Sequence, residues 1–232
     1  MATVASVVVA AGEGRRLGAG APKAFVSLAG RAMFLHSLEA LAAVPGLAEQ
    51  VLVVPPGSAA EARGRWGSEF GRLRVSAVVE GGARRQDSAA AGFRALSPAA
   101  EIVLVHDAAR PLLRTEDAAR VAEAAGREGA ALLAVPISDT LKREGAERRV
   151  AETLDRRGLW RAQTPQGFRR EVYAAALARA ERDGTDATDD AALVESAGGA
   201  VVLVEGDGSN LKVTTEADLR RAERALAAGG GR

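Results

Sequence analysis

Hydrophobic positions along this chain follow two periodicities. Short apolar runs rich in β-branched residues are typical of buried strands, whereas apolar residues that recur every three or four positions predict helices. In the first part of the chain, strands are predicted at 4–11, 50–54, 73–79, 102–105 and 130–135. Helices are predicted between them at 32–44, 58–70 and 85–96, and a fourth helix begins after its cap at Thr115.

The second part of the chain continues this pattern after an interruption. Helices are predicted at 170–181, 189–197 and 215–228, with a strand at 200–204. Between 138 and 160 the chain is highly charged and lacks an apolar stripe large enough for a core. We interpret this segment as a two-stranded β-arm with a hairpin over 142–153. A disordered loop is the alternative, but loops of this length are uncommon in compact domains unless they are functional.

Strands that alternate with helices indicate an α/β fold with a mostly parallel sheet and helices on both faces. A chain of 232 residues is long enough for one large domain with a substantial core. No repeat or interdomain linker divides it. We therefore expect a single domain over 1–232, with the arm at 138–160 inserted in it.

Composition narrows the classes of function. The formal net charge is +1 and no long basic run occurs, so we expect no binding of nucleic acid through bulk electrostatics. The chain has no apolar span of membrane length and no signal-peptide pattern, so we expect a cytoplasmic protein without membrane association. The absence of cysteine excludes disulfides, thiol catalysis and cysteine metal ligands.

The loop after the first strand is the strongest candidate for chemistry. In VVVAAGEGRRLGAGAPK, at 7–23, glycines allow close approach of the backbone, and Arg16 and Lys23 supply positive charge, as in a phosphate cradle. Leu17 stands where the dinucleotide fingerprint has its third glycine, and Ala24 follows Lys23 where a P-loop has Ser or Thr. The remaining pattern, A-A-G-x-G-x-R-[LM]-x(5)-P-K, resembles the signature of nucleotidyltransferases that act on sugar and polyol phosphates.

Three further strand ends carry polar residues, and ligands of parallel sheets bind beyond the carboxyl ends of the strands. GGARRQDS combines two glycines with Ser88, whose hydroxyl can bond a base or a ribose. HDAARP places Asp107 directly after a buried strand, and EGDGSNLKVT carries Lys212. Only three lysines occur in this arginine-rich chain, which favours a site for a compact ammonium at Lys23 and Lys212. Four such ends on one edge outline a single pocket.

Together these segments resemble one family. The N-terminal loop, GGxxRxxS, HDAARP, DTLKR, DRRGLW, QTPQGF, TDD and EGDGSNLKVT occur in this order over nearly the whole chain, as in the 2-C-methyl-D-erythritol 4-phosphate cytidylyltransferases. The resemblance implies a nucleotidyltransferase domain of Rossmann-like topology and a projecting β-arm, at 138–160, that builds a homodimer. It also implies Mg²⁺-dependent transfer of CMP from CTP to the polyol phosphate, with release of pyrophosphate, in isoprenoid precursor synthesis.

Roles for single residues follow from the charge that develops in this reaction. The acceptor phosphate attacks the α-phosphorus of CTP in line, so negative charge gathers on the nonbridging and leaving oxygens. No general base is required, because a phosphate oxygen is already nucleophilic. The candidate catalytic cations are Arg16, Lys23 and Lys212, and the candidate Mg²⁺ ligand is Asp107.

The binding residues form two further groups. The resemblance and the glycine-rich segments predict that the nucleotide is bound by Ala10, Ala11, Gly12, Gly14, Gly81, Gly82, Ser88 and Asp107. The resemblance implies that the acceptor phosphate is bound by Arg110, Thr140, Arg156, Thr164, Thr188 and Lys212. His36 and His106 are expected to be structural, and Asp207 is a weaker candidate for a second metal ligand.

Two other functions stay open. Ribitol- and glycerol-phosphate cytidylyltransferases have the same fold and use CTP, and the triphosphate loop does not meet the carbon skeleton of the acceptor. The DRRGLW and TDD segments favour methylerythritol phosphate. A noncatalytic nucleotide-binding module belongs to a different class. The combination of Arg16, Lys23, Asp107 and Lys212 argues against it, because binding alone seldom needs all four.

Overall fold

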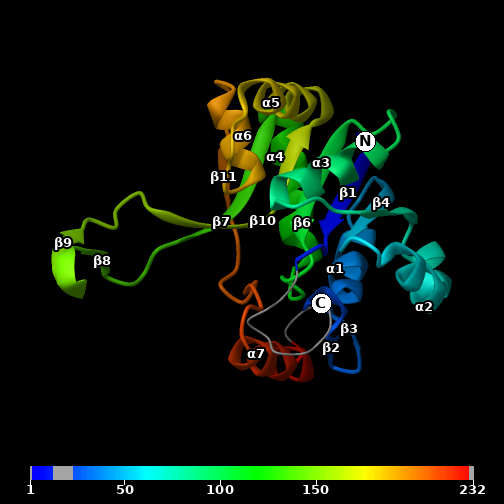
Figure 1. The fold of residues 1–232 in the computed structure, drawn as a ribbon, viewed down its shortest axis with the longest axis horizontal. Helices are drawn as coiled ribbons and strands as arrows, with labels where there is room; N and C mark the ends of the chain where they lie inside the picture. The colour runs from blue at the N-terminus through cyan, green and yellow to red at the C-terminus, as the bar shows by residue number, and fades with distance from the viewer. Residues whose placement is uncertain (1, 13–22, 230–232) are drawn as a thin grey trace.

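The computed structural model describes residues 2–12 and 23–229. Within them the chain forms a seven-stranded sheet in the order β11-β7-β10-β6-β1-β4-β5 (Figure 1). Strand β10 runs antiparallel to β6 and β7, and the other pairings in this sheet are parallel. The strands are β1 (Val4–Val9), β4 (Leu47–Val54), β5 (Val75–Glu80), β6 (Ile102–Asp107), β7 (Ala130–Pro136), β10 (Trp160–Arg169) and β11 (Val202–Glu205). The predicted α/β fold with a mostly parallel sheet is confirmed.

Helices cover both faces of the sheet, because alternate strand residues point to opposite sides. Val4 and Val8 of β1 pack on one face, and Ala5 and Val7 pack on the other. The first face is covered by α1 (Met33–Ala42), α2 (Ala59–Arg72) and α4 (Thr115–Glu128). The second face is covered by α3 (Arg85–Ala95), α5 (Arg170–Asp183) and α6 (Asp190–Ser196).

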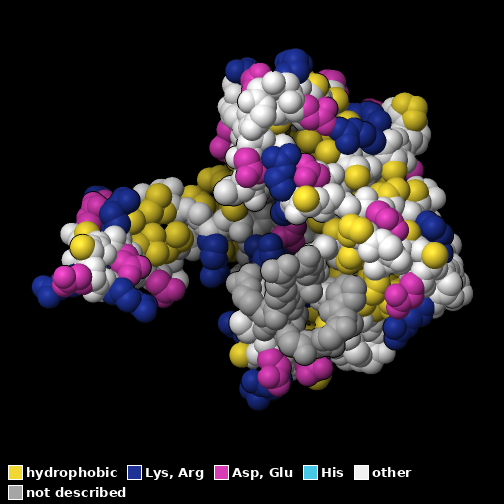
Figure 2. Space-filling view, in the orientation of Figure 1, with side chains coloured by type: hydrophobic (Ala, Val, Ile, Leu, Met, Phe, Trp, Pro, Cys, Tyr) yellow, Lys and Arg dark blue, Asp and Glu magenta, His cyan; other side chains and the backbone are white. Residues whose placement is uncertain are grey.

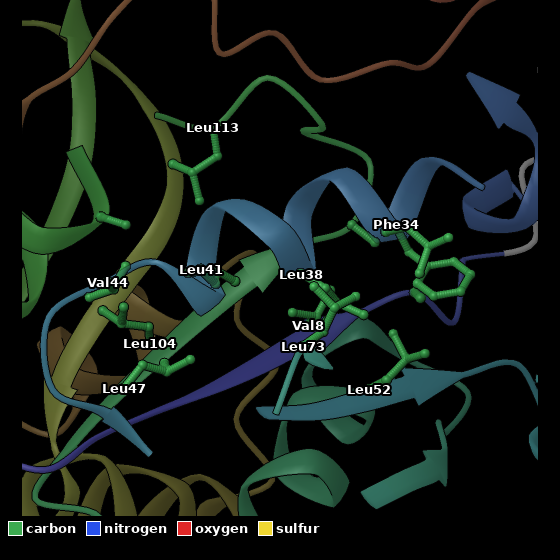
Figure 3. Close-up of a cluster of buried hydrophobic side chains, with 14 of the residues drawn as sticks. Val8, Phe34, Leu38, Leu41, Val44, Leu47, Leu52, Leu73, Leu104 and Leu113 are labelled. Carbon is green, nitrogen blue, oxygen red and sulfur yellow. The ribbon is translucent and has the colours of Figure 1, made fainter. Parts of the chain in front are cut away.

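The first face holds the larger core. Figure 3 shows Phe34 and Leu38 of α1 lying over Val8 and Leu52, which belong to the adjacent strands β1 and β4. These four side chains are fully buried. This burial stabilises the fold through the hydrophobic effect, and it holds α1 against β1 and β4.

Strand β10 is the strand of the seven-stranded sheet that the hydrophobic pattern does not predict. Its buried middle contains Gln163, Thr164 and Gln166, which are 3%, 4% and 1% exposed. These side chains bond to the loop after β11, to His106 of β6 and to α6, so a polar sequence occupies a buried strand. The register between β10 and β7 also shifts between Ala162 and Gln166. Hydrophobic periodicity cannot reveal a strand whose buried positions are polar.

The predicted hairpin within 138–160 is present. β8 (Leu141–Glu144) and β9 (Val150–Leu154) pair antiparallel, and the 3₁₀ turn η3 (Ala146–Arg148) joins them. Figure 1 shows this hairpin at the left, away from the seven-stranded sheet. Hydrophobic side chains gather on it in Figure 2, and Val150 is 62% exposed. Its role in dimerisation stays a prediction.

The remaining described elements meet at a small third cluster of buried side chains around Leu28 and Met33. The 3₁₀ turn η2 (Lys23–Phe25) is followed by a small hairpin of β2 (Ser27–Leu28) and β3 (Arg31–Ala32). The last helix, α7 (Glu216–Ala227), packs on this region through Ala222, beside Leu28 of β2. Among the described helices, none combines the length and the hydropathy that a bilayer crossing requires.

Candidate functional site

The carboxyl ends of the central strands surround a cavity of about 990 Å³. From β1 the chain winds outward to β4 and β5, and then returns to β6 on the other side of β1. Ligands of doubly wound sheets bind where the winding reverses, and this volume suits a nucleotide. The predicted site residues that line the cavity are Ala10, Ala11, Gly12, Lys23, Gly81, Gly82, Ser88, Asp107 and Lys212. All four predicted strand ends therefore contribute to one pocket.

Close packing at the end of β5 shapes this cavity. A Cβ atom on Gly81 would lie 2.5 Å from the Cβ of Ala11 and 2.5 Å from Ser88 Oγ, so only glycine fits there. The amide of Gly82 donates to Ser88 Oγ at 3.2 Å, and the Ser88 hydroxyl donates to the carbonyl of Arg84 at 3.2 Å. Ser88 is therefore engaged in holding the glycine loop in place. A Cβ on Gly12, by contrast, meets nothing within 4 Å.

A compact charge cluster lies at the end of β6. Asp107 Oδ1 accepts from Arg85 Nε at 2.9 Å, and Asp107 Oδ2 accepts from Lys212 Nζ at 2.6 Å. Burial alone would raise the pKa of the Asp107 carboxyl, but Arg85 and Lys212 hold this pKa well below its usual range. Asp107 is therefore a permanent anion at the edge of the cavity.

Sequence reasoning missed Arg85 and its second partner, Asp190. Arg85 Nη1 lies 2.7 Å from Asp190 Oδ2, and the hydroxyl of Tyr173 donates to Asp190 Oδ1 at 2.6 Å. Burial lowers the pKa of the Arg85 guanidinium, but Asp190 and Asp107 outweigh it and the pKa is raised above its ordinary value. Two signals could have found this pair: the arginine of GGxxRxxS and the second aspartate of TDD.

Asp107 is the candidate ligand at this cavity for the expected Mg²⁺ ion. Mg²⁺ keeps several waters and is usually bound through one or two carboxylates together with substrate phosphates. Within residues 2–12 and 23–229, no group of three His, Asp or Glu side chains could hold a metal alone. Asp107 fits as the single carboxylate ligand, because Lys212 on its Oδ2 is 43% exposed and can shift toward a phosphate. Asp207, the weaker candidate, pairs with Arg114 at 3.0 Å.

Two of the predicted acceptor-binding residues lie beside Asp107. The hydroxyl of Thr164 accepts from the Asp107 amide at 3.1 Å and bonds to His106 Nδ1 at 3.0 Å. Arg110 donates to the carbonyls of Asn210 and Ala162, at 2.8 and 3.2 Å. These contacts join the HDAARP segment to β10 and to the NLKVT segment.

His106 is buried among these groups. Burial lowers the pKa of His106 to about 4, so the ring is neutral at physiological pH. Its Nε2 lies 3.1 Å from the carbonyl of Arg110, and Thr164 occupies Nδ1. Both ring nitrogens are bonded inside the protein, in agreement with the structural role expected for this residue. His36 likewise bonds through Nε2 to the carbonyl of Leu28 at 2.9 Å.

Of the six predicted acceptor-binding residues, Lys212 lines the cavity of this chain; Arg110, Thr164, Thr140, Arg156 and Thr188 do not. Thr140 and Arg156 flank the β8–β9 hairpin, and Arg156 donates to the carbonyl of Ser138. Thr188 is exposed in the turn before α6. Gly14 and Arg16 lie outside the described residues, so their predicted roles stay predictions.

Comparison with known proteins identifies the family. The model of the family described as "IspD: 2-C-methyl-D-erythritol 4-phosphate cytidylyltransferase" matches residues 4–228. The chain belongs to this family. A 2-C-methyl-D-erythritol 4-phosphate cytidylyltransferase of Pelotomaculum thermopropionicum is 44% identical over 232 residues, which are 100% of this chain and 98% of that protein.

Other family members differ in length. The "Bifunctional enzyme IspD/IspF" of Rhodospirillum rubrum is 46% identical over 226 residues, 97% of this chain, but the match spans only 57% of that protein. The crystal structure of the family member from Thermus thermophilus has a TM-score of 0.80 and 38% identity, and covers 98% of this chain and 100% of its own. The fold described above is therefore that of a cytidylyltransferase of this family.

Proposed function

We propose that this protein transfers CMP from CTP to 2-C-methyl-D-erythritol 4-phosphate and releases pyrophosphate. The products are 4-diphosphocytidyl-2-C-methyl-D-erythritol and pyrophosphate, and the reaction serves the synthesis of isoprenoid precursors. The observation that carries the proposal is the placement of Lys23, Lys212 and Asp107 around one cavity in a chain of this family. Cations suit a triphosphate, and the carboxylate suits its counterion.

The chain's own residues supply positioning and charge in this reaction. Gly81 and Gly82 pack closely against Ala11, Ser88 and Asp87, and this glycine loop forms the part of the cavity wall on which the base and ribose would lie. Lys23, with the predicted Arg16, neutralises the triphosphate. Lys212 shifts from Asp107 toward the phosphates, where it stabilises the negative charge on the oxygens of the α-phosphate.

A bound Mg²⁺ ion would supply further charge neutralisation at the phosphates, with Asp107 as its protein ligand. In-line attack by the acceptor phosphate then requires no proton transfer by the protein. The neutral state of His106 agrees with this mechanism, because its ring is buried and bonded on both nitrogens. Positioning and electrostatic stabilisation therefore account for the chemistry.

The acceptor is the least constrained part of the proposal. Ribitol phosphate and glycerol phosphate present the same attacking group, and the cavity around Asp107 recognises charge more than carbon skeleton. Methylerythritol phosphate is favoured because the family and the relatives with this name cover the whole chain. A noncatalytic nucleotide-binding module does not explain why Asp107 and Lys212 pair at the cavity edge.

The experiment measures pyrophosphate release from CTP in the presence of Mg²⁺ with each of the three polyol phosphates in turn. Release with methylerythritol phosphate, and little with the other two, is the expected result. Preference for ribitol or glycerol phosphate would replace the acceptor. Tight CTP binding without release for any acceptor would support the noncatalytic alternative.

We also propose that the enzyme works as a homodimer in the cytoplasm. The β8–β9 hairpin exposes Val150 and lies apart from the main sheet, so a second subunit would cover its apolar side chains (Figure 2). Isolated two-stranded hairpins are only marginally stable in water, which also favours a covering partner. The mass in solution, measured by light scattering with and without 138–160, tests this assembly.

A further inference from the structure

One guanidinium joins the carboxylate at the cavity to a second carboxylate in the core. Arg85 bonds to Asp107 at 2.9 Å and to Asp190 at 2.7 Å. The Asp190 side chain is only 1% exposed, and its other oxygen accepts from Tyr173. Lys212 bonds to the other oxygen of Asp107. Positive and negative side chains therefore alternate from Lys212 at the cavity to Asp190, beside the core that α3, α5 and α6 form on the second face of the sheet.

The inner end of this chain is rigid. The ring of Tyr173 stacks on Phe168 of β10, with centroids 4.7 Å apart, and meets the edge of Phe93 of α3 at 5.2 Å. Tyr173 is fully buried, and burial together with Asp190 raises the pKa of its hydroxyl, which therefore stays a hydrogen-bond donor. The Asp190 side chain is consequently held in one position beside Arg85.

We propose that Arg85 is a positioning residue that holds the Asp107 carboxylate in one orientation. Arg85 bonds to Oδ1, and Oδ2 is therefore the oxygen that faces Lys212 and would face a group bound in the cavity. A terminal carboxylate torsion is otherwise broad, so an unsupported Asp107 would present either oxygen in several directions. The inference rests on the proposed function, since it assigns Arg85 a part in setting the geometry of that reaction.

The side-chain type supports this role. The Nε and Nη1 atoms of Arg85 bond to two different carboxylates. A planar guanidinium has donors in two directions for this, whereas a lysine has a single ammonium nitrogen and cannot span both carboxylates equally well. The third nitrogen, Nη2, is buried without a hydrogen-bond partner in the described part of the chain. An unpaired buried donor costs free energy, and the charge-assisted bonds of Nε and Nη1 to the two aspartates offset this cost.

The principal test is a double-mutant cycle between Arg85 and Asp107. Arg85→Lys keeps the charge but cannot span both acids, so kcat should fall by roughly 10- to 100-fold while KM for CTP changes little. In an Asp107→Asn background, the same Arg85→Lys change should add less than about twofold, because Arg85 acts through Asp107. Additive losses would assign Arg85 a direct contact with substrate and overturn the proposal.

Stability is separated from positioning by a matched control and a melting curve. Arg94→Lys alters another ion-paired arginine of α3, which contacts Glu181 at the surface, and should leave kcat unchanged. All rates are measured well below the melting temperature of each variant. A lower melting temperature for Arg85→Lys with an unchanged kcat would show a purely structural ion pair and refute the inference.

A crystal structure of Arg85→Lys provides a readout that needs no turnover. The Asp107 carboxylate should leave the orientation in which Oδ2 lies 2.6 Å from Lys212 Nζ. An unchanged carboxylate would contradict the proposal. If the wild-type chain releases no pyrophosphate with any acceptor, the proposed function fails, and this structure alone decides the role of Arg85.

Discussion

Gly81 shows how a single residue shapes the nucleotide cavity. Three elements meet there: the end of β1 at Ala11, the end of β5, and the first turn of α3 at Ser88. The absence of one side chain lets these elements approach closely and leaves backbone groups at the cavity wall. The same position therefore serves packing and recognition together.

Gly81→Ala should weaken CTP binding. The new Cβ would lie 2.5 Å from Ala11 Cβ and from Ser88 Oγ, so the loop must shift. Overpacking of this kind costs about 1–3 kcal/mol, which corresponds to a KM for CTP raised about tenfold or more. Steady-state kinetics measure the effect.

Gly64→Ala in α2 is the control, because nothing lies within 4 Å of its Cβ and kinetics should not change. An unchanged KM for Gly81→Ala would show that this packing does not set nucleotide affinity.

Asp107 illustrates how two cations tune one carboxylate. Asp107→Asn keeps the shape but removes the charge between Arg85 and Lys212. A neutral amide is a poor ligand for Mg²⁺, so we expect Mg²⁺-dependent turnover to fall on the order of 100-fold. A Mg²⁺ titration of turnover measures the loss, and circular dichroism checks the fold.

Asp207→Asn is the comparison for this experiment. Asp207 pairs with Arg114, and its Oδ1 accepts from the Ser209 amide at 2.7 Å. The variant should keep the Mg²⁺ dependence of the wild type. If Asp207→Asn loses that dependence and Asp107→Asn retains it, the metal ligand is Asp207.

At the scale of elements, helix α7 holds the segment that carries Lys212. Asp218, in its first turn, accepts from the amides of Thr214 and Thr215 at 2.9 and 2.8 Å. The Thr214 hydroxyl donates to the same carboxylate at 2.7 Å. These bonds satisfy backbone donors at the helix start and fasten the preceding NLKVT segment to the helix.

Asp218→Ala should lower stability by about 1 kcal/mol at neutral pH, as the loss of a helix cap usually does. The hydrogen bond from Thr214 and the neighbouring amides lower the pKa of Asp218 from 3.8 to about 2. A depressed folded-state pKa stabilises the protein above pH 3.8, and this stabilisation is lost as the pH falls toward 2. The difference in urea midpoint between variant and wild type should therefore be full at pH 7 and should shrink below pH 4.

The control for this prediction is Glu216→Ala. Glu216 lies in the same first turn and pairs with exposed Arg220, so its removal should cost less than about 0.5 kcal/mol. A difference between Asp218→Ala and wild type that stays constant from pH 7 to pH 3 would contradict the capping role of the ionised carboxylate.

At the scale of the whole molecule, the hairpin and the cavity are separate. Arg156, predicted to bind the acceptor phosphate, flanks the hairpin and does not line the cavity of its own chain. Figure 1 shows the hairpin lying away from the sheet. A second subunit could bring Arg156 to the cavity, which explains how a residue so placed could bind the acceptor.

Mixed dimers test whether Arg156 acts across subunits. Arg156→Ala should raise KM for methylerythritol phosphate and leave CTP affinity nearly unchanged, and Lys23→Ala should lower kcat. At a methylerythritol phosphate concentration well below the raised KM, both homodimers should be nearly inactive. In a hybrid dimer of the two chains, one pocket carries both defects and the other carries neither, so activity should partly return. Verified subunit exchange without recovery would place Arg156 in the site of its own chain.

Local pattern alone determined much of this protein. The spacing of apolar positions predicted both strands and helices. Elements such as β1 and α1 bury one or both faces, and the residues on a face recur at a fixed spacing along the chain. Strand ends with glycine, lysine or aspartate predicted the cavity, because parallel strands bring their carboxyl ends to one edge. The order of the segments from the glycine-rich loop to NLKVT indicated the family that comparison then confirmed.

Only the tertiary structure decided which distant groups meet. Arg85 and Asp190 are 105 positions apart, and so are Asp107 and Lys212, and their pairing depends on the winding order of the sheet. Strand β10 lies in the sheet with buried glutamines and a threonine because the loop after β11, strand β6 and the start of α6 supply their hydrogen-bond partners. Hydrophobic periodicity is a property of residues that are close in sequence, and it predicts which apolar side chains are buried. The partners of a buried polar group exist only after the sheet has formed.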